Sequence, residues 1–185
     1  LYTWMNNPES QMVAVTVRAG SKAEMALPDG TFVHLNAATN LEYDVNNSKQ
    51  RLVKLSGEAF FDVAKNPDCP FKVIINDLQI EVVGTSFNVK TYKKDIVETS
   101  LLSGRIRISG GSLPHEYTLS PGQKATYSAM DRTLRISKAD AHVEAGWRDN
   151  YLIFESTPLI DVIAQIERWY GVEIRLHHKQ IAQDL

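Results

Sequence analysis

The sequence has very little of what several functional classes require. Its 185 residues include one cysteine, Cys69, so an internal disulfide is impossible and CxxC-type zinc motifs are absent. The 20 Lys and Arg are offset by 22 Asp and Glu, and no basic run forms a patch, so we predict no nucleic-acid partner. No apolar run approaches the roughly 18–20 residues that span a bilayer. The composition leaves the cellular compartment open.

Motifs that carry common enzyme chemistry are also missing. The sequence contains no HExxH zinc motif, no GxSxG nucleophile elbow and no GxxxxGK[ST] phosphate loop. Of the five histidines, only His177 and His178 are adjacent, and neighbours on a strand point to opposite faces, so they do not chelate one metal easily. The others, His34, His115 and His142, are scattered. We therefore predict no cofactor, no metal site and no enzymatic activity.

Two weaker indications of chemistry remain. Glu58 and Asp62 are four residues apart on a predicted strand and therefore share a face, and paired carboxylates carry out glycoside hydrolysis. Such a pair more often meets Lys or Arg across a strand or caps a turn, so we interpret it as structural. Trp4, Trp147 and Trp169 would stack on a sugar if exposed together, but Trp169 lies on the apolar face of a predicted helix and is better explained as core.

Short β-strands divided by turns account for residues 12–139. In the central stretch, Ala59, Phe61 and Val63 share one face and Phe60 lies on the other, which predicts a half-buried strand. With roughly a dozen such strands and a turn about every 8–12 residues, the pattern predicts a mainly β domain, either an antiparallel β-sandwich or a solenoid-like stack. Both stay open, although the lack of a fixed internal period weighs against a regular β-helix.

Three tight turns predict hairpins. Pro28-Asp29-Gly30 combines a proline that presets φ with a glycine that tolerates positive φ, and Thr31–Leu35 is expected to return as the partner strand. Asn76-Asp77 and Ser103-Gly104 each separate two β-type runs. The runs on either side of each turn are therefore predicted to pair antiparallel.

The pattern changes after residue 139. Residues 140–150 are predicted to be a linker with a short helix, and residues 151–185 a separate module. Runs 151–154 and 172–176 have the composition of strands, and a helical pattern lies between them. Strand, helix and strand at this length predict a small, incomplete βαβ module.

The helix of this module has clear boundaries in the sequence. Thr157 is the expected N-cap with Pro158 at the first helical position, and Gly171 is expected to end the helix in a left-handed conformation. Between them the apolar residues follow the 3.6-residue period of one helix face. The residues of this face are Leu159, Val162, Ile163, Ile166, Trp169 and Tyr170.

Four segments of the chain carry a resemblance to a known family. They are LPDGTFVHLNAATNLEY (Leu27–Tyr43), LSGEAFFDVAKNPDCPFKV (Leu55–Val73), VVGTSFNVKTY (Val82–Tyr92) and LSPGQKATY (Leu119–Tyr127). In order and spacing, over roughly residues 13–150, they resemble the signature segments of the FecR family. The following FESTPLIDVIAQIERWYGVEI (Phe154–Ile174) resembles the start of the small domain that usually follows, a relative of the short secretin and TonB N-terminal module.

The resemblance implies the periplasmic signal-receiving region of a single-pass inner-membrane anti-sigma factor. Such a region binds the signalling domain of a TonB-dependent outer-membrane transducer. It regulates an extracytoplasmic-function sigma factor through a cytoplasmic segment outside the residues printed here, and the membrane would be crossed only by a helix ahead of them. The signal, an iron complex or a glycan, stays open, as do the particular sigma factor and transducer and the oligomeric state.

The expected partner-binding residues are Val172, Glu173, Ile174, Arg175 and Leu176. As an exposed edge strand they would extend a partner's sheet by main-chain hydrogen bonding; the alternative is an interior position in their own module. Two other functions are weighed against this one. The first is a β-domain that senses carbohydrate directly or is purely structural, without transducer contact, and the second is a hydrolase that uses the carboxylates noted above.

Overall fold

The computed structural model describes residues 11–45 and 51–176, with only the backbone of residues 141 and 142. Fourteen strands and three short helices make up this part of the chain. The strands are β1 (Met12–Val17), β2 (Ala23–Ala26), β3 (Phe32–Leu35), β4 (Thr39–Asp44), β5 (Leu52–Ser56), β6 (Glu58–Asp62), β7 (Phe71–Ile75), β8 (Leu78–Val82), β9 (Ser86–Lys90), β10 (Ile96–Ser103), β11 (Ile106–Gly110), β12 (Tyr117–Leu119), β13 (Gln123–Ser128) and β14 (Thr133–Lys138). The helices are α1 (Ala141–Ala145), the 3₁₀ helix η1 (Gly146–Asp149) and α2 (Leu159–Tyr170).

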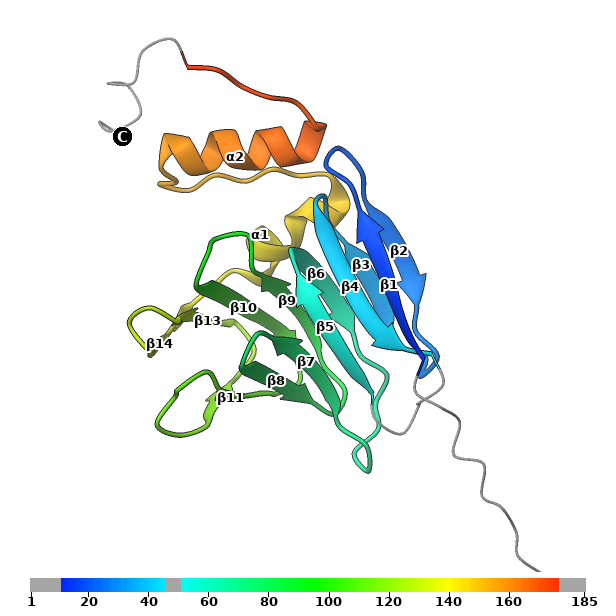
Figure 1. Ribbon diagram of the computed structural model, residues 1–185. Coiled ribbons are helices and arrows are strands. Elements are labelled where there is room, and N and C mark those ends of the chain that lie inside the picture. Colours follow the sequence, from blue (N-terminus) through cyan, green and yellow to red (C-terminus); the bar gives the residue numbers. More distant parts are fainter. Residues whose placement is uncertain (1–10, 46–50, 177–185) are drawn as a thin grey trace, which may run out of the picture.

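Two seven-stranded sheets form a sandwich (Figure 1). The first sheet has the order β1-β4-β5-β7-β8-β11-β12, and the second has the order β14-β13-β10-β9-β6-β3-β2. The chain crosses between the sheets after every one or two strands, and all pairs are antiparallel except β5 with β7. The prediction of a mainly β domain is confirmed. Of the two predicted alternatives, a sandwich and a solenoid-like stack, the two packed sheets correspond to a sandwich. The chain nevertheless advances steadily from one edge to the other, as it would in a solenoid.

The core lies between the two sheets. Phe61 of β6 and Phe87 of β9 stack at 5.3 Å between ring centroids, and Phe71 of β7 meets Phe61 from the opposite sheet at 5.8 Å. Aromatic pairs at these separations add to the free energy gained by removing apolar area from water. The largest fully buried side chains are Phe61, Phe71, Phe87, Leu35, Leu41, Leu78, Ile80, Leu101, Ile106, Ile108, Leu119 and Val33.

Two of the three predicted hairpins are confirmed. Strand β2 pairs with β3, and Gly30 in the turn between them has a φ of +84°. The Asp29 carboxylate accepts hydrogen bonds from the backbone N–H of Thr31 at 3.0 Å and from its hydroxyl at 2.8 Å, which holds the turn. Strand β7 pairs with β8 across Asn76-Asp77.

The third predicted hairpin, at Ser103-Gly104, is wrong. Strand β10 pairs with β9 and β13 in the second sheet, whereas β11 pairs with β8 and β12 in the first. The turn therefore carries the chain across the sandwich. Gly104 has a φ of +90°, and a Cβ there would lie 2.6 Å from the Thr85 hydroxyl oxygen, so the crossing needs glycine. Turn residues mark where the chain changes direction, but not which sheet receives the next strand.

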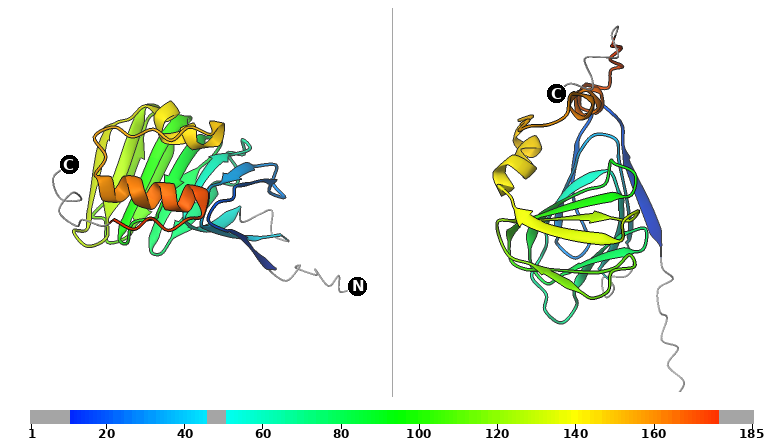
Figure 2. Two further views of the ribbon diagram at one scale, coloured as in Figure 1. Left: turned by 90° about the horizontal axis from the view of Figure 1, so that it is seen from above. Right: turned by 90° about the vertical axis from the view of Figure 1, so that its left-hand side faces the viewer.

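Strand β6 is buried on both faces, which corrects the prediction of a half-buried strand. The predicted alternation is present: Ala59 and Phe61 face the core between the sheets, and Phe60 points the other way. Phe60 is buried as well, because the helices that follow β14 lie over the outer face of the second sheet (Figure 2). We call α1, η1 and α2 together the cap.

Helix α2 ends as predicted but begins differently. Gly171 has a φ of +67°, and its N–H donates to the carbonyl of Glu167, which confirms the left-handed C-cap. At the other end Pro158 is the N-cap, and the hydroxyl of Thr157 instead donates to the carbonyl of Glu155 at 3.3 Å, so the predicted Thr157 cap is wrong. A capping hydroxyl must face the first helical N–H groups, and here it folds back on its own turn.

The two strands predicted beside α2 are absent from the described residues. Neither 151–154 nor 172–176 has strand structure, because neither pairs with another strand in 11–45 or 51–176. The N–H of Ile174 donates instead to the Glu167 carboxylate at 2.7 Å. Residues 177–185 lie outside the described part, so the division into a domain at 12–139, a linker at 140–150 and a module at 151–185 stays a prediction. No helix in the described part is long and apolar enough to cross a membrane.

Candidate interaction site between the sandwich and its cap

The cap is attached to the sandwich through a small aromatic cluster. Trp147 of η1 is buried and packs with Phe60 and Ala145, and Trp169 of α2 lies against the same cluster. The guanidinium of Arg148 lies 3.6 Å from the centroid of the Phe60 ring, in cation–π geometry. Phe60 can receive these residues because it points away from the sandwich core. The predicted linker is therefore a packed element that covers the second sheet.

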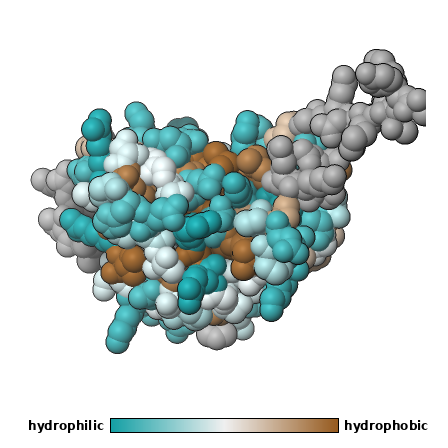
Figure 3. Space-filling view, turned by 90° about the horizontal axis from the view of Figure 1, so that it is seen from below, coloured by the Kyte–Doolittle hydropathy of each residue, from teal (hydrophilic) through white to brown (hydrophobic). Residues whose placement is uncertain are grey.

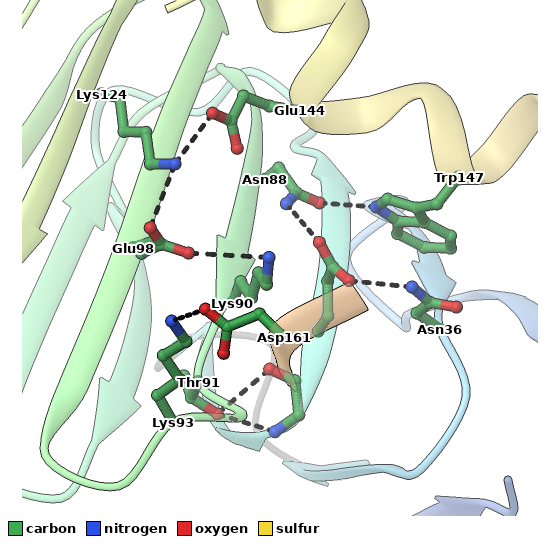
Figure 4. Close-up of polar contacts among 12 residues, drawn as sticks. Asn36, Asn88, Lys90, Thr91, Lys93, Glu98, Lys124, Glu144, Trp147 and Asp161 are labelled. Atoms are coloured by element: carbon green, nitrogen blue, oxygen red, sulfur yellow. Dashed lines mark hydrogen bonds and ion pairs between the residues drawn. The ribbon is translucent and has the colours of Figure 1, made fainter. Parts of the chain in front are cut away.

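A buried polar cluster lies beside these aromatic residues (Figure 4). The two carboxylate oxygens of Glu58 accept hydrogen bonds from the amide nitrogens of Asn36, at 2.8 Å, and Asn88, at 3.0 Å. The amide oxygen of Asn88 accepts from the indole N–H of Trp147 at 3.1 Å. All four residues are buried, so strands β6 and β9, the loop after β3 and the cap are joined by one chain of hydrogen bonds.

Each hydrogen bond in this cluster runs in a fixed direction. The Trp147 indole nitrogen can only donate, so it must face the Asn88 oxygen, which leaves the Asn88 amide N–H to Glu58. Asn36 is fixed in the same way, because its oxygen accepts from the N–H of Ala37 at 2.8 Å. Glu58 therefore meets two donors. Burial raises the pKa of Glu58, and the Lys90 ammonium, the two amides and Arg168 oppose this rise.

Ion pairs continue from this cluster across the outer face of the second sheet (Figure 4). The Lys124 ammonium lies 3.1 Å from Glu98 and 2.8 Å from Glu144 of α1, and Lys90 lies 3.7 Å from Glu98. Burial by itself would raise the pKa of Glu98, but the attraction of the Lys124 and Lys90 ammonium groups for the carboxylate is stronger than this effect, so the pKa of Glu98 is lowered. Lys124 therefore ties the sheet to the first helix of the cap.

Helix α2 spans the sandwich from one loop to another. At its C-terminal end, the Lys22 ammonium lies 3.5 Å above the Trp169 ring and donates to the Trp147 carbonyl at 2.5 Å and to the Asn150 side chain at 2.9 Å. The N–H of Gly20 donates to the carbonyl of Arg168 at 2.8 Å. The turn between β1 and β2 therefore anchors this end of the helix.

The N-terminal end of α2 is held by the loop between β9 and β10. The Lys93 ammonium lies 2.7 Å from the carboxylate of Asp161, in the first turn of the helix. The Arg168 guanidinium, further along α2, lies 4.1 Å from the ring centroid of Tyr92. The two ends of α2 are thus joined to the sandwich mainly by charged groups and rings.

A cavity of about 230 Å³ lies under the cap. Its walls include Lys90, Lys124 and Glu144, which are already members of the ion-pair network. In residues 11–45 and 51–176 no three His, Cys, Asp or Glu side chains are grouped so that they could hold a metal ion. The charged residues that line this cavity belong to the contact between the second sheet and the cap.

Exposed apolar side chains are concentrated after the cap's 3₁₀ helix. We call these residues the C-terminal apolar strip: Tyr151, Ile153, Phe154, Ile160, Tyr170, Val172 and Leu176. Tyr170, predicted on the apolar helix face, is 63% exposed, whereas Ile163 of that face is buried. On the face turned away from α2, apolar surface is broken up by polar side chains (Figure 3). Where such side chains lie next to one another, they form the apolar patches that mark contact surfaces.

The five residues predicted to bind a partner belong to this region. Val172 to Leu176 leave α2 at its C-cap and run back alongside the helix (Figures 1 and 2). Val172 is 50% and Leu176 41% exposed, and Arg175 pairs with Glu173 at 3.0 Å. The structure therefore places the five residues together at the surface, but not as a strand, and their role as a partner-binding edge stays a prediction.

The other residues singled out in the sequence have separate environments. Glu58 is buried under the cap, whereas Asp62 is exposed at the end of β6 and accepts from the Ser86 hydroxyl at 2.7 Å, so the two carboxylates do not form one site. Trp147 and Trp169 are packed in the cap, and Trp4, His177 and His178 lie outside the described residues.

Nothing in the sequence pattern singles out Asn36 and Asn88 as partners of Glu58. Asparagine in a turn-rich sequence ordinarily indicates a loop or turn, and each of these two is far from Glu58 along the chain. The sequence does show Asn88 as a polar residue inside a β-type run, and in the structure it lies opposite Phe60, two residues along β6 from Glu58. Only the pairing of β6 with β9 turns this position into a hydrogen-bonding partner.

The fold and this interface define a β-sandwich domain with a docked helical segment. The family model for the FecR protein matches residues 13–107, and the model for the FecR C-terminal region matches residues 151–185. The chain belongs to the FecR family.

Two solved structures support this assignment. Both are crystal structures of a candidate anti-sigma factor from Parabacteroides distasonis ATCC 8503, at 2.50 Å and 1.65 Å resolution, with 32% sequence identity to this chain. Their TM-scores are 0.81 and 0.80; the matches cover 88% and 87% of this chain and 76% of each of those chains. No curated protein matches the chain.

Replacing Glu58 with glutamine is expected to destabilise the protein by about 1–3 kcal/mol. The NH₂ group of the new side chain would face the donating amide of either Asn36 or Asn88, so a buried N–H would be left without an acceptor. The loss should be larger at pH 4 than at pH 8. The pKa of Glu58 is raised in the folded protein, so its contribution to stability is complete below the ordinary glutamate pKa and falls as pH rises through the folded value. Urea unfolding at several pH values measures both effects.

Glu98→Gln is the matched control for this pH dependence. Because the pKa of Glu98 is lowered, its contribution is present above the ordinary glutamate pKa and is lost as pH falls, so the destabilisation by Glu98→Gln should be larger at pH 7 than at pH 4. A pH dependence of the same sign for both variants would contradict this account of the cluster.

Proposed function

We propose that this chain is the periplasmic signal-receiving region of a transmembrane anti-sigma factor. Membership of the FecR family and the similarity to the candidate anti-sigma factor of P. distasonis support this role. The sigma factor is the extracytoplasmic-function type, and it binds a cytoplasmic segment outside the residues printed here. An inner-membrane anchor joins that segment to the periplasmic region.

The signal reaches this region from the signalling domain of a TonB-dependent outer-membrane transducer. The observation that carries this proposal is the exposed C-terminal apolar strip, which runs into Val172–Leu176 without a strand partner in the described part of the chain. The N–H groups of Val172 and Ile174 already donate to Glu167, so the backbone groups on the other side of the segment, those of Glu173 and Arg175, would join the sheet of another protein, while alternate side chains select that protein. In this mode Val172, Ile174 and Leu176 face one side, and Glu173 and Arg175 the other.

The test is calorimetric titration of the purified chain with the signalling domain of the transducer encoded next to it. Wild-type protein should bind, and Val172→Asp combined with Leu176→Asp should weaken binding by about tenfold or more, because two charges would enter an apolar contact. Ile136→Asp is the control, since Ile136 is also an exposed apolar residue but lies opposite the core residue Ala125, on the face of the second sheet turned away from the cap.

Each other outcome counts against part of the proposal. If binding survives the double substitution, the contact lies elsewhere on the chain. If neither this chain nor a longer form of the protein binds, the transducer is not the partner. In that case saturable binding of a glycan by the wild-type chain would favour direct ligand sensing by the sandwich.

A further inference from the structure

The four edges of the two sheets differ in how well they are protected. Natural edge strands are shortened or carry charged residues, which keeps them from pairing with other chains. Strand β12 has three residues, β2 has four and includes Glu24, and β14 carries Arg135 and Lys138. Strand β1 has six residues, MVAVTV, without a charge or a proline, and in the described part of the chain it pairs only with β4 (Figure 1).

The outward backbone groups of β1 follow from its register. The N–H of Val45 donates to the carbonyl of Gln11 at 3.1 Å, and these residues extend the register that pairs Met12 with Asp44. In an antiparallel pair, hydrogen-bonded and non-hydrogen-bonded residues alternate. Odd-numbered residues of β1 therefore bond to β4, and the N–H and carbonyl groups of Met12, Ala14 and Thr16 point out of the sheet.

The side chains of β1 are also incompletely covered. Val13, Val15 and Val17 lie on the core side of the first sheet, yet Val13 and Val15 are only half-buried, and Val15 packs at the margin of the core. On the outer face Ala14 is exposed and small. A further strand beside β1 would cover the two valines and meet no bulky side chain at the middle of the strand.

We propose that β1 pairs with β1 of a second copy of this chain, antiparallel, so that the first sheets of both copies join. The two-fold axis passes beside Ala14, which faces Ala14 of the other copy. Met12 then faces Thr16, and Val13 faces Val15. The three outward-pointing residues of each strand meet the three of the other, so every outward N–H finds a carbonyl. No charged side chains oppose each other, and the same patch serves both copies, as two-fold symmetry requires.

This proposal is independent of the transducer contact proposed above, which lies on residues 151–176. Analytical ultracentrifugation of the chain across a wide concentration range should show reversible dimers. Ala14→Pro should weaken dimerisation by about tenfold or more, because the proline removes an outward N–H and places its ring against the other copy. It should leave the monomer folded, since that N–H is not bonded to β4 and proline is tolerated at such edge positions. Thermal unfolding checks this point.

A charge exchange tests the register itself. Ala14→Lys alone and Ala14→Glu alone should each be monomeric, because like charges would meet at the axis, whereas a mixture of the two should form heterodimers. The same exchange at Thr133, on the basic edge strand β14, should have no effect. The proposal would be overturned if the chain is monomeric at every concentration, or if the substitutions of Ala14 leave dimerisation unchanged. If Ala14→Pro abolished binding of the transducer's signalling domain, this edge would be assigned to that partner instead.

Discussion

Arg51→Met is expected to destabilise the protein by about 3–5 kcal/mol, the cost typical of removing one partner from a buried ion pair. The Arg51 side chain is 1% exposed and lies 2.7 Å from the carboxylate of Asp29, which is 10% exposed. Its other guanidinium nitrogens donate to the carbonyls of Cys69, at 2.7 Å, and Ala64, at 2.5 Å. Without the guanidinium, the Asp29 carboxylate loses its counter-ion and the two carbonyls each lose a charged hydrogen-bond donor inside the protein.

The position of this pair explains why the effect should be global. Asp29 also holds the turn between β2 and β3, whereas the carbonyls of Ala64 and Cys69 belong to the segment between β6 and β7. Arg51 thus joins turns from both sheets at one end of the sandwich. Urea unfolding followed by circular dichroism measures the loss.

Arg107→Met is the control for Arg51→Met. Arg107 pairs with Glu81 and Glu116, but its side chain is 50% exposed, and ion pairs in water contribute little. Equal stability of Arg51→Met and the wild-type protein would contradict the role given to the buried pair. A smaller loss in the double variant Arg51→Met, Asp29→Asn than in Arg51→Met would support it, because the uncompensated charge would be gone.

Trp147→Ala is expected to cost about 3–5 kcal/mol in the docking of the cap on the sandwich, the range for truncating a buried aromatic side chain. The substitution removes the ring that packs on Phe60 and the indole N–H that donates to Asn88. It also weakens the contact with Trp169, so both η1 and α2 lose their attachment. We expect hydrogen exchange in residues 143–170 to become much faster, while the core strands keep their protection.

Trp147→Phe separates packing from hydrogen bonding. It keeps most of the apolar area and loses only the bond to Asn88, so the cap should stay docked with a loss of about 1 kcal/mol. If Trp147→Ala left the exchange rates in the cap unchanged, the ion pairs of Lys124 and Lys93 would have to hold the cap alone. If it unfolded the whole protein, the cap and sandwich would form one cooperative unit.

Local patterns in the sequence determined much of the fold. The period of two in the β-rich runs, the Pro28-Asp29-Gly30 turn and the Asn76-Asp77 turn predicted strands and hairpins that the structure has. The period of 3.6 and Gly171 predicted α2 and its end. These signals depend on residues close in the chain, which is why one sequence suffices to interpret them. The four family-like segments pointed to the FecR family in the same way.

Other features were decided only by the tertiary structure, because they depend on contacts between residues far apart in the chain. The Ser103-Gly104 turn crosses between sheets, and Phe60 is buried because Ala145 and Trp147 of the cap, far later in the chain, cover it. The sequence identifies Glu58 as a carboxylate on a strand, but Asn36, Asn88 and Trp147, which determine its environment, come from three other parts of the chain. Side-chain alternation tells which residues share a face, whereas the element that packs on that face depends on long-range packing, which no local period encodes.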